Sequence, residues 1–115
     1  MTRPADDAFD ALQALDHALD SSISELRSAR ERLQSVRDAR HAGKPWREIV
    51  DVEEKPLVVE SLSTVLERLS TVGSRFRRTQ AQALHAEGLS MERVASLFGV
   101  TRQRVSALLR DREAS

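Results

Sequence analysis

The chain has 115 residues, which suffices for one domain or for a small domain joined to an extended helical element. Aromatic residues make up only 3% of it, and this composition favours long helices over a sandwich or barrel. There is no cysteine, which excludes disulfides, thiolate zinc sites and cysteine nucleophiles and predicts a reducing, cytoplasmic setting.

The distribution of apolar residues predicts neither a membrane span nor a signal peptide. The longest apolar run is about three residues, Leu57 to Val59, and the first ten residues include three aspartates. We therefore expect a soluble protein of the cytoplasm.

The formal net charge of zero conceals a segregation of charge along the chain. Residues 1–26 contain six acidic residues and a single arginine, whereas residues 68–110 contain eight arginines and only two glutamates. The C-terminal part therefore suits a polyanion and the N-terminal part repels one.

The first long segment predicts a helix of about 35 to 38 residues. It begins near Pro4, a residue whose fixed φ suits the first helical position, and ends before Gly43, a plausible C-terminal cap. Leucine recurs every seven residues at heptad position a, with Phe9 and Ile23 widening the stripe. The residues at positions a and d are Leu12, Leu19, Leu26 and Leu33, and Leu15, Ser22, Ala29 and Val36, respectively.

A short helical turn is expected after Pro45. It contains Trp46, Ile49 and Val50, which we expect to fill the end of a helical bundle.

A second apolar stripe follows Pro56, with heptad-like spacing. Gly73, followed by Ser74, is expected to weaken this helix, which bends or breaks there before resuming through Ala86. Gly88 ends it. The stripe consists of Val58, Leu62, Val65, Leu69, Val72 and Phe76.

The two stripes predict an all-α fold: a long N-terminal, coiled-coil-like helical hairpin in residues 1–72, followed by a second domain in residues 73–115. The hairpin is either self-contained or paired with a second copy. We favour a homodimer, because an isolated two-helix hairpin buries only part of its apolar surface. The expected dimerisation residues are Leu12, Leu15, Leu19, Leu26, Leu33, Leu62 and Leu69.

The C-terminal stretch SMERVASLFGVTRQRVSALLR carries a helix-turn-helix pattern. Ser90 and Thr101 are suited to cap two short helices, and Gly99 suits the turn between them. Ala95 is small where the helices must cross closely. The apolar positions are Val94, Phe98, Val100, Val105 and Leu108.

This stretch resembles the helix-turn-helix superfamily of bacterial DNA-binding proteins. GVTRQRV is similar to part of sigma factor region 4, and the longer run HAEGLSMERVASLFGVTRQRVSALL resembles small helix-turn-helix proteins of actinobacteria. The resemblance covers roughly residues 77–110 and implies that residues 73–115 form a helix-turn-helix domain that binds double-stranded DNA. We therefore expect the protein at the nucleoid.

The helical period indicates which side chains of the second short helix face DNA. With Val105 directed inward, the opposite side reads base edges in the major groove, and arginines nearby contact phosphates. The expected base contacts are Thr101, Arg102, Gln103, Ser106, Ala107 and Arg110. The expected phosphate contacts are Arg75, Arg77, Arg78, Ser90, Arg93 and Arg104.

Three functions remain open, and none is an enzyme. The favoured one is a dimeric transcriptional regulator that reads the major groove through residues 102–111. The first alternative is a nucleoid-associated architectural protein, and the second is an adaptor whose acidic N-terminal helix contacts RNA polymerase or another protein. His17, His41 and His85 lack metal-ligand spacing, and no phosphate loop or nucleophile motif is present, so we expect no metal and no cofactor.

Overall fold

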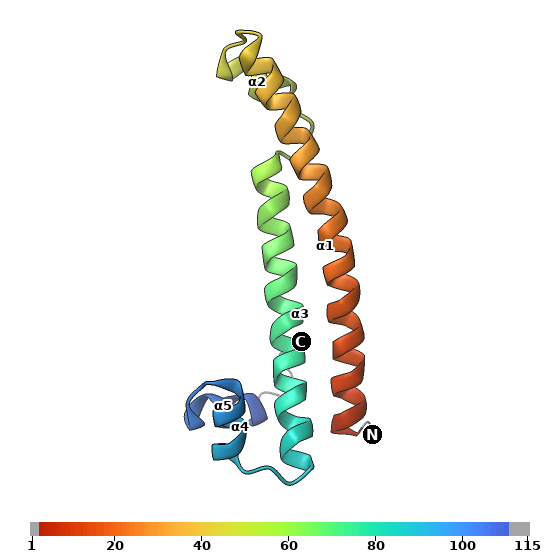
Figure 1. Ribbon diagram of the computed structural model, residues 1–115, viewed down its shortest axis with the longest axis vertical. Coiled ribbons are helices and arrows are strands. Elements are labelled where there is room, and N and C mark those ends of the chain that lie inside the picture. Colours follow the sequence, from red (N-terminus) through yellow and green to blue (C-terminus); the bar gives the residue numbers. More distant parts are fainter. Residues whose placement is uncertain (1–2, 111–115) are drawn as a thin grey trace. The chain divides into compact units, whose positions relative to one another are not determined.

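The structure, a computed structural model, describes residues 3–110. These residues form five helices, α1 Pro4–His41, α2 Trp46–Val52, α3 Val58–Ala86, α4 Met91–Phe98 and α5 Arg102–Arg110, which confirms the all-α prediction (Figure 1). None of these helices has a stretch both long and apolar enough to cross a membrane.

The chain divides into two compact units, and both long helices run through both of them. One unit is Leu19–Arg68, and the other combines Met1–Ala18 with Leu69–Ser115. The predicted boundary at residues 72 and 73 falls inside α3, so it does not coincide with a break between helices.

Helix α1 has the length that the sequence predicts. It runs for 38 residues from Pro4, with Asp6 and Asp7 in the first turn, where carboxylates interact favourably with the helix dipole. Beyond its last residue, Gly43 has a φ of +88°, which a glycine adopts without the steric cost of a Cβ.

In the unit Leu19–Arg68, α1 and α3 lie side by side and antiparallel (Figure 1). Small side chains on α1 form its side of the contact: Ser22 is 2% exposed and Ala29 4%. From α3, Val58 and Val65 are buried, and Ile49 of α2 is buried as well. We call this row of buried residues the seam.

The leucines of heptad position a, which we expect in a dimer interface, do not take part in this seam. Leu19, Leu26 and Leu33 are between 41% and 48% exposed, while Ser22 and Ala29 of position d are buried. Polar contacts from Glu25 and Arg32 fix the rotation of α1, because these side chains must lie on the side that faces α3 and the loop before it.

An ion pair joins the two long helices within this unit. Arg68 donates from both terminal nitrogens to Glu25, with Nη1–Oε2 and Nη2–Oε1 distances of 2.6 and 3.1 Å. The hydrogen bond lowers the pKa of the Glu25 carboxyl and raises the pKa of Arg68. Because the carboxyl pKa is lower in the folded state, the stabilisation is present above the ordinary glutamate pKa and is lost as pH falls through the lowered value.

Arg32 closes the loop between α2 and α3. Its Nη2 donates to the carbonyl oxygens of Glu54, at 2.5 Å, and of Pro56, and Nη1 donates to Ser61 Oγ at 3.4 Å. The guanidinium thereby holds the loop against α1.

Of the three residues expected to fill the end of a helical bundle, Ile49 is buried, whereas Trp46 and Val50 are not. Trp46 is 58% exposed and Val50 is 44% exposed. Helix α2 has seven residues and presents one side to α1, which Ile49 occupies. The Trp46 ring instead lies against Arg40, with 5.7 Å from the guanidinium carbon to the ring centroid.

In the other unit, Ala11 and Ala18 of α1 are buried, whereas Phe9 and Leu12 are 56% and 45% exposed. Helix α3 is continuous through Gly73, so the chain does not break there. A glycine inside a helix lowers its stability by about 1 kcal/mol relative to alanine. The apolar positions on both sides of Gly73 outweigh that cost.

Candidate nucleic-acid interface

Both short helices begin, and α4 ends, where the sequence predicts; the predicted end of the second helix at Asp111 lies outside the described residues. Ser90 Oγ accepts a hydrogen bond from the backbone N–H of Arg93 at 3.2 Å, which caps α4. Thr101 Oγ1 accepts from the N–H of Arg104 at 3.1 Å and caps α5 in the same way. Both caps satisfy amide groups that a helix leaves without an intrahelical partner.

Gly99 makes the turn between the two helices possible. It has a φ of +67° and a ψ of 35°, a left-handed conformation, and its N–H donates to the carbonyls at the end of α4. A side chain here would meet no atom within 4 Å, so the requirement for glycine comes from the backbone and not from crowding.

Two alanine substitutions should change stability in opposite directions. Gly99→Ala forces a Cβ into the left-handed region and should destabilise by about 1 kcal/mol. Gly73→Ala, in the regular part of α3, should stabilise by about 0.5 to 1 kcal/mol, because no atom lies within 4 Å of the added Cβ. Urea unfolding measures both; a loss of stability in both variants would contradict the assigned backbone conformations.

A small apolar core fixes the orientation of α5. Val105 and Leu108 are 0% and 6% exposed and pack with Val94 and Ala95 of α4 and with Ala81 of α3. Partly buried side chains surround this core; they are Leu84, Leu89, Met91, Phe98 and Leu109. Because these contacts hold one side of α5, the opposite side is presented outward.

The outward side of α5 carries most of the residues predicted to contact bases. Arg102, Gln103 and Arg110 are exposed, and Ser106 and Ala107 are half-buried. Thr101 is exposed, but its hydroxyl serves as the cap of α5. There is no acidic residue among the residues of α5.

Arg102 has a local partner that sequence reasoning missed. Its Nε lies 3.1 Å from Glu92 Oε1, and both side chains are about two-thirds exposed, at 64% and 66%. An exposed pair of this kind contributes about 0 to 1 kcal/mol. Glu92 thus offsets the unfavourable position of Arg102 in the first turn of α5, so Arg102 has a structural as well as a binding explanation.

The arginines predicted to contact phosphates differ in accessibility. The Arg77 guanidinium carbon lies 4.2 Å from the centroid of the Phe98 ring, which joins α3 to α4. Arg78 is only 6% exposed. Arg77, Arg93 and Arg104 are exposed, and Arg75 is half-buried. Arg93 and Arg104 are therefore the exposed arginines of this set that have no such aromatic contact.

Three hydroxyl groups beside α5 were missed by the sequence analysis. Ser70, Thr71 and Ser74 line an open hollow of about 390 Å³ between α3 and α5, together with Arg78, Arg104, Ala107 and Leu108. Ser70, Ser74 and Arg78 follow one another at intervals of four, which places them on one side of a helix. That spacing could have indicated from the sequence that Ser70 and Ser74 lie on the same side of the helix as Arg78.

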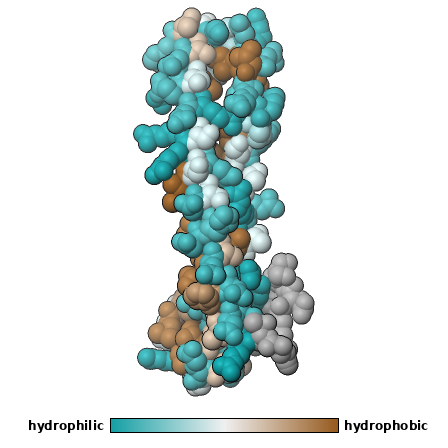
Figure 2. Space-filling view, turned by 90° about the vertical axis from the view of Figure 1, so that its right-hand side faces the viewer, coloured by the Kyte–Doolittle hydropathy of each residue, from teal (hydrophilic) through white to brown (hydrophobic). Residues whose placement is uncertain are grey.

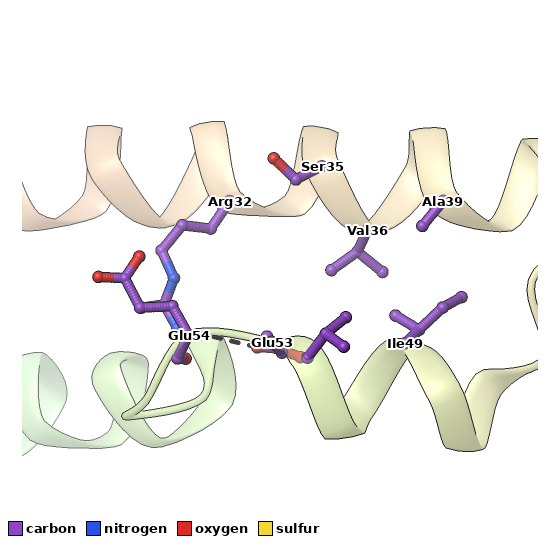
Figure 3. Close-up of a pocket in the computed structure, with 8 residues that line it drawn as sticks. Arg32, Ser35, Val36, Ala39, Ile49, Glu53 and Glu54 are labelled. Atoms are coloured by element: carbon purple, nitrogen blue, oxygen red, sulfur yellow. Dashed lines mark hydrogen bonds and ion pairs between the residues drawn. The ribbon is translucent and has the colours of Figure 1, made fainter.

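A second, separate hollow lies in the unit Leu19–Arg68. Figure 3 shows Val36, Ala39 and Ile49 pointing toward one another, with Arg32 close to Glu53 and Glu54. The Arg32 guanidinium donates to backbone carbonyls and pairs with Glu53, so its donors are used within the chain. We therefore assign this hollow to the packing of the hairpin.

Within residues 3–110, no three histidine, aspartate or glutamate side chains are grouped as a metal site would require. Comparison of the chain with protein-family models gave no match. Comparisons with curated proteins and with solved structures likewise gave no match. The assignment of function therefore depends on the residues themselves.

Proposed function

We propose that this protein binds double-stranded DNA without catalysis, as a dimeric transcriptional regulator of bacterial type. In this proposal α4 and α5 form a helix-turn-helix, and α5 enters the major groove. The observation that carries the proposal is the outward side of α5, where Arg102, Gln103 and Arg110 are exposed on a helix whose other side is held by a core.

The chemistry of this side suits base edges. A guanidinium can donate two hydrogen bonds to guanine, and a glutamine amide can pair with adenine. Ser106 and Ala107 are small, which allows the helix backbone to approach the groove floor. The exposed Arg93 and Arg104 flank this side and suit phosphates.

A dimer would place two copies of α5 on two half-sites about 34 Å apart. Pairing would also double the number of base contacts, which a nine-residue helix alone keeps small.

The readout side of α5 can be tested by two single substitutions. Gln103→Ala and Arg110→Ala should each reduce discrimination between preferred and unrelated duplexes by about 1 to 3 kcal/mol. Titration with fluorescent duplexes at fixed salt measures this loss. Gln13→Ala on α1 and Arg47→Ala on α2, both at exposed positions, are the matched controls.

The same titration separates the proposal from nucleoid coating. An architectural protein binds chiefly through phosphates, with a steep salt dependence and little preference for sequence. If both α5 variants bind every duplex as the parent chain does, specific readout by α5 is wrong; a parent chain with little preference among duplexes and a steep salt dependence would support the architectural alternative. Absence of binding to any duplex at low salt would favour the adaptor.

A further inference from the structure

The unit Leu19–Arg68 leaves a row of large aliphatic side chains of α1 in contact with solvent. Leu19, Ile23, Leu26 and Leu33 are 45%, 48%, 41% and 48% exposed. Their spacing of four, three and seven residues places them along one side of the helix. This row is distinct from the seam, which Ser22 and Ala29 occupy.

Helix α3 presents a matching row in the same unit. Val59 and Leu66 are 73% and 68% exposed, and Leu62, between them, is half-buried. Their spacing of three and four residues again follows a heptad. Two adjacent helices therefore each expose an aliphatic row.

Helical geometry puts the two rows on one side of the hairpin. On each helix the row contains residues directly after seam residues: Ile23 follows Ser22 on α1, and Val59 and Leu66 follow Val58 and Val65 on α3. A step of one residue turns by about 100°. Because α1 and α3 are antiparallel with their seams facing each other, these equal steps point to the same side.

The opposite side of the hairpin is polar. Ser28, Ser61 and Thr64 line a common hollow of about 230 Å³ on that side, with Glu25 and Arg32. Figure 2, which looks onto α1, shows mainly hydrophilic and neutral side chains along the middle of the view. The hairpin is therefore apolar on one side, which we call the aliphatic face: Leu19, Ile23, Leu26, Leu33, Val59, Leu62 and Leu66.

The seam itself buries little apolar surface, because its α1 side consists of alanine and serine. Ser22 Oγ is buried there without a hydrogen-bond partner. The larger side chains, which would contribute most to burial, lie on the aliphatic face instead. An exposed apolar patch of this kind marks an interaction surface.

We propose that the aliphatic face is covered by a second copy of this chain, and that the two hairpins form a four-helix bundle in which α1 of each copy lies on α3 of the other. Both rows repeat at heptad spacing, so two identical layers can interdigitate.

Exposed charges favour a second copy as the partner and favour the pairing of α1 with α3 of that copy. Next to the aliphatic face α1 carries the exposed Arg27 and Arg30, with the exposed acids Asp20 and Glu31 further around the helix, while the outer side of α3 carries the exposed acids Glu60 and Glu67. Placing α1 on α3 of the second copy brings Arg27 and Arg30 toward acids, whereas placing α1 on α1 brings these arginines toward each other. The chain's net charge of zero adds no general repulsion between copies.

Sedimentation equilibrium without DNA tests the proposal on the full chain. The parent chain should show twice its mass of 12.9 kDa at micromolar concentration. The double variant Leu26→Ser, Leu66→Ser should raise the dimer dissociation constant at least a hundredfold while circular dichroism still reports helix. The control Ser28→Ala, Thr64→Ala changes the polar side and should leave the mass unchanged.

Charge reversal tests whether α1 of each copy lies on α3 of the other. Arg27→Glu alone and Glu67→Arg alone should each weaken the dimer several-fold, and the two together should restore it. A parent chain that remains monomeric, or a dimer that the leucine substitutions do not weaken, would overturn the proposal. Failure of the double reversal to restore the dimer would overturn the pairing of α1 with α3 of the other copy. A monomer that binds DNA would contradict this inference but not DNA binding. A dimer that does not bind DNA would contradict DNA binding but not this inference.

Discussion

Val105→Asp should unfold the pair of helices α4 and α5 and abolish DNA binding with it. Val105 is 0% exposed and packs with Ala81, Val94 and Leu108. A carboxylate at this position would be buried without a partner, and an uncompensated buried charge costs about 3 to 5 kcal/mol. So small a core has no other contacts that could offset a loss of that size.

Gln103→Asp is the matched control, because it introduces the same side chain on the outward side of the same helix. Thermal unfolding followed by circular dichroism should show a strongly lowered melting temperature for Val105→Asp and nearly the parent value for Gln103→Asp. Both variants should fail to bind DNA, the first through loss of structure and the second through repulsion of phosphates. Parent-like melting of Val105→Asp would refute the assigned core.

The double reversal Arg93→Glu, Arg104→Glu should raise the stability of the fold and lower its affinity for DNA. Both residues are exposed and lie in the first turns of α4 and α5, where a negative charge interacts favourably with the helix dipole. Folding should therefore gain a few tenths of a kcal/mol. Affinity for duplex DNA should fall at least a hundredfold, about 3 kcal/mol, because two phosphate contacts become repulsive.

Binding isotherms at several salt concentrations, with urea unfolding of the same samples, measure both effects. The slope of log affinity against log salt should become shallower by about 0.9 per lost phosphate contact. Lys44→Glu, Arg47→Glu changes the net charge equally at exposed positions near α2 and should bind almost as the parent does. Equal weakening of both double variants would indicate that net charge alone governs binding.

The sequence was sufficient to predict the helices and several of their ends. Pro4, Ser90 and Gly99 act through the backbone: a fixed φ, a side chain that caps amide groups, and tolerance of a left-handed conformation. Such effects are local, so they can be read from a few neighbouring residues. The inward position of Val105 and Leu108 followed from the helical period in the same way.

The rotation of α1 could not be predicted in this manner. Ala11 and Ala18 recur every seven residues, as do Leu12 and Leu19 one position later, and a seven-residue period alone does not decide which row faces α3. Contacts made across more than twenty residues decide it, chiefly those of Arg32 with the loop before α3. Hydrophobicity favoured the leucines, whereas close approach of the helices required the smaller side chains.

Selection of bound duplexes from a random pool tests the central claim most directly. The full chain is incubated with the pool at low and at moderate salt, and the retained DNA is sequenced. The proposed readout by α5 predicts enrichment of one motif at moderate salt, which the Gln103→Ala variant relaxes at particular positions. Retention of no duplex even at low salt would contradict DNA binding, and retention without any enriched motif would contradict sequence-specific regulation.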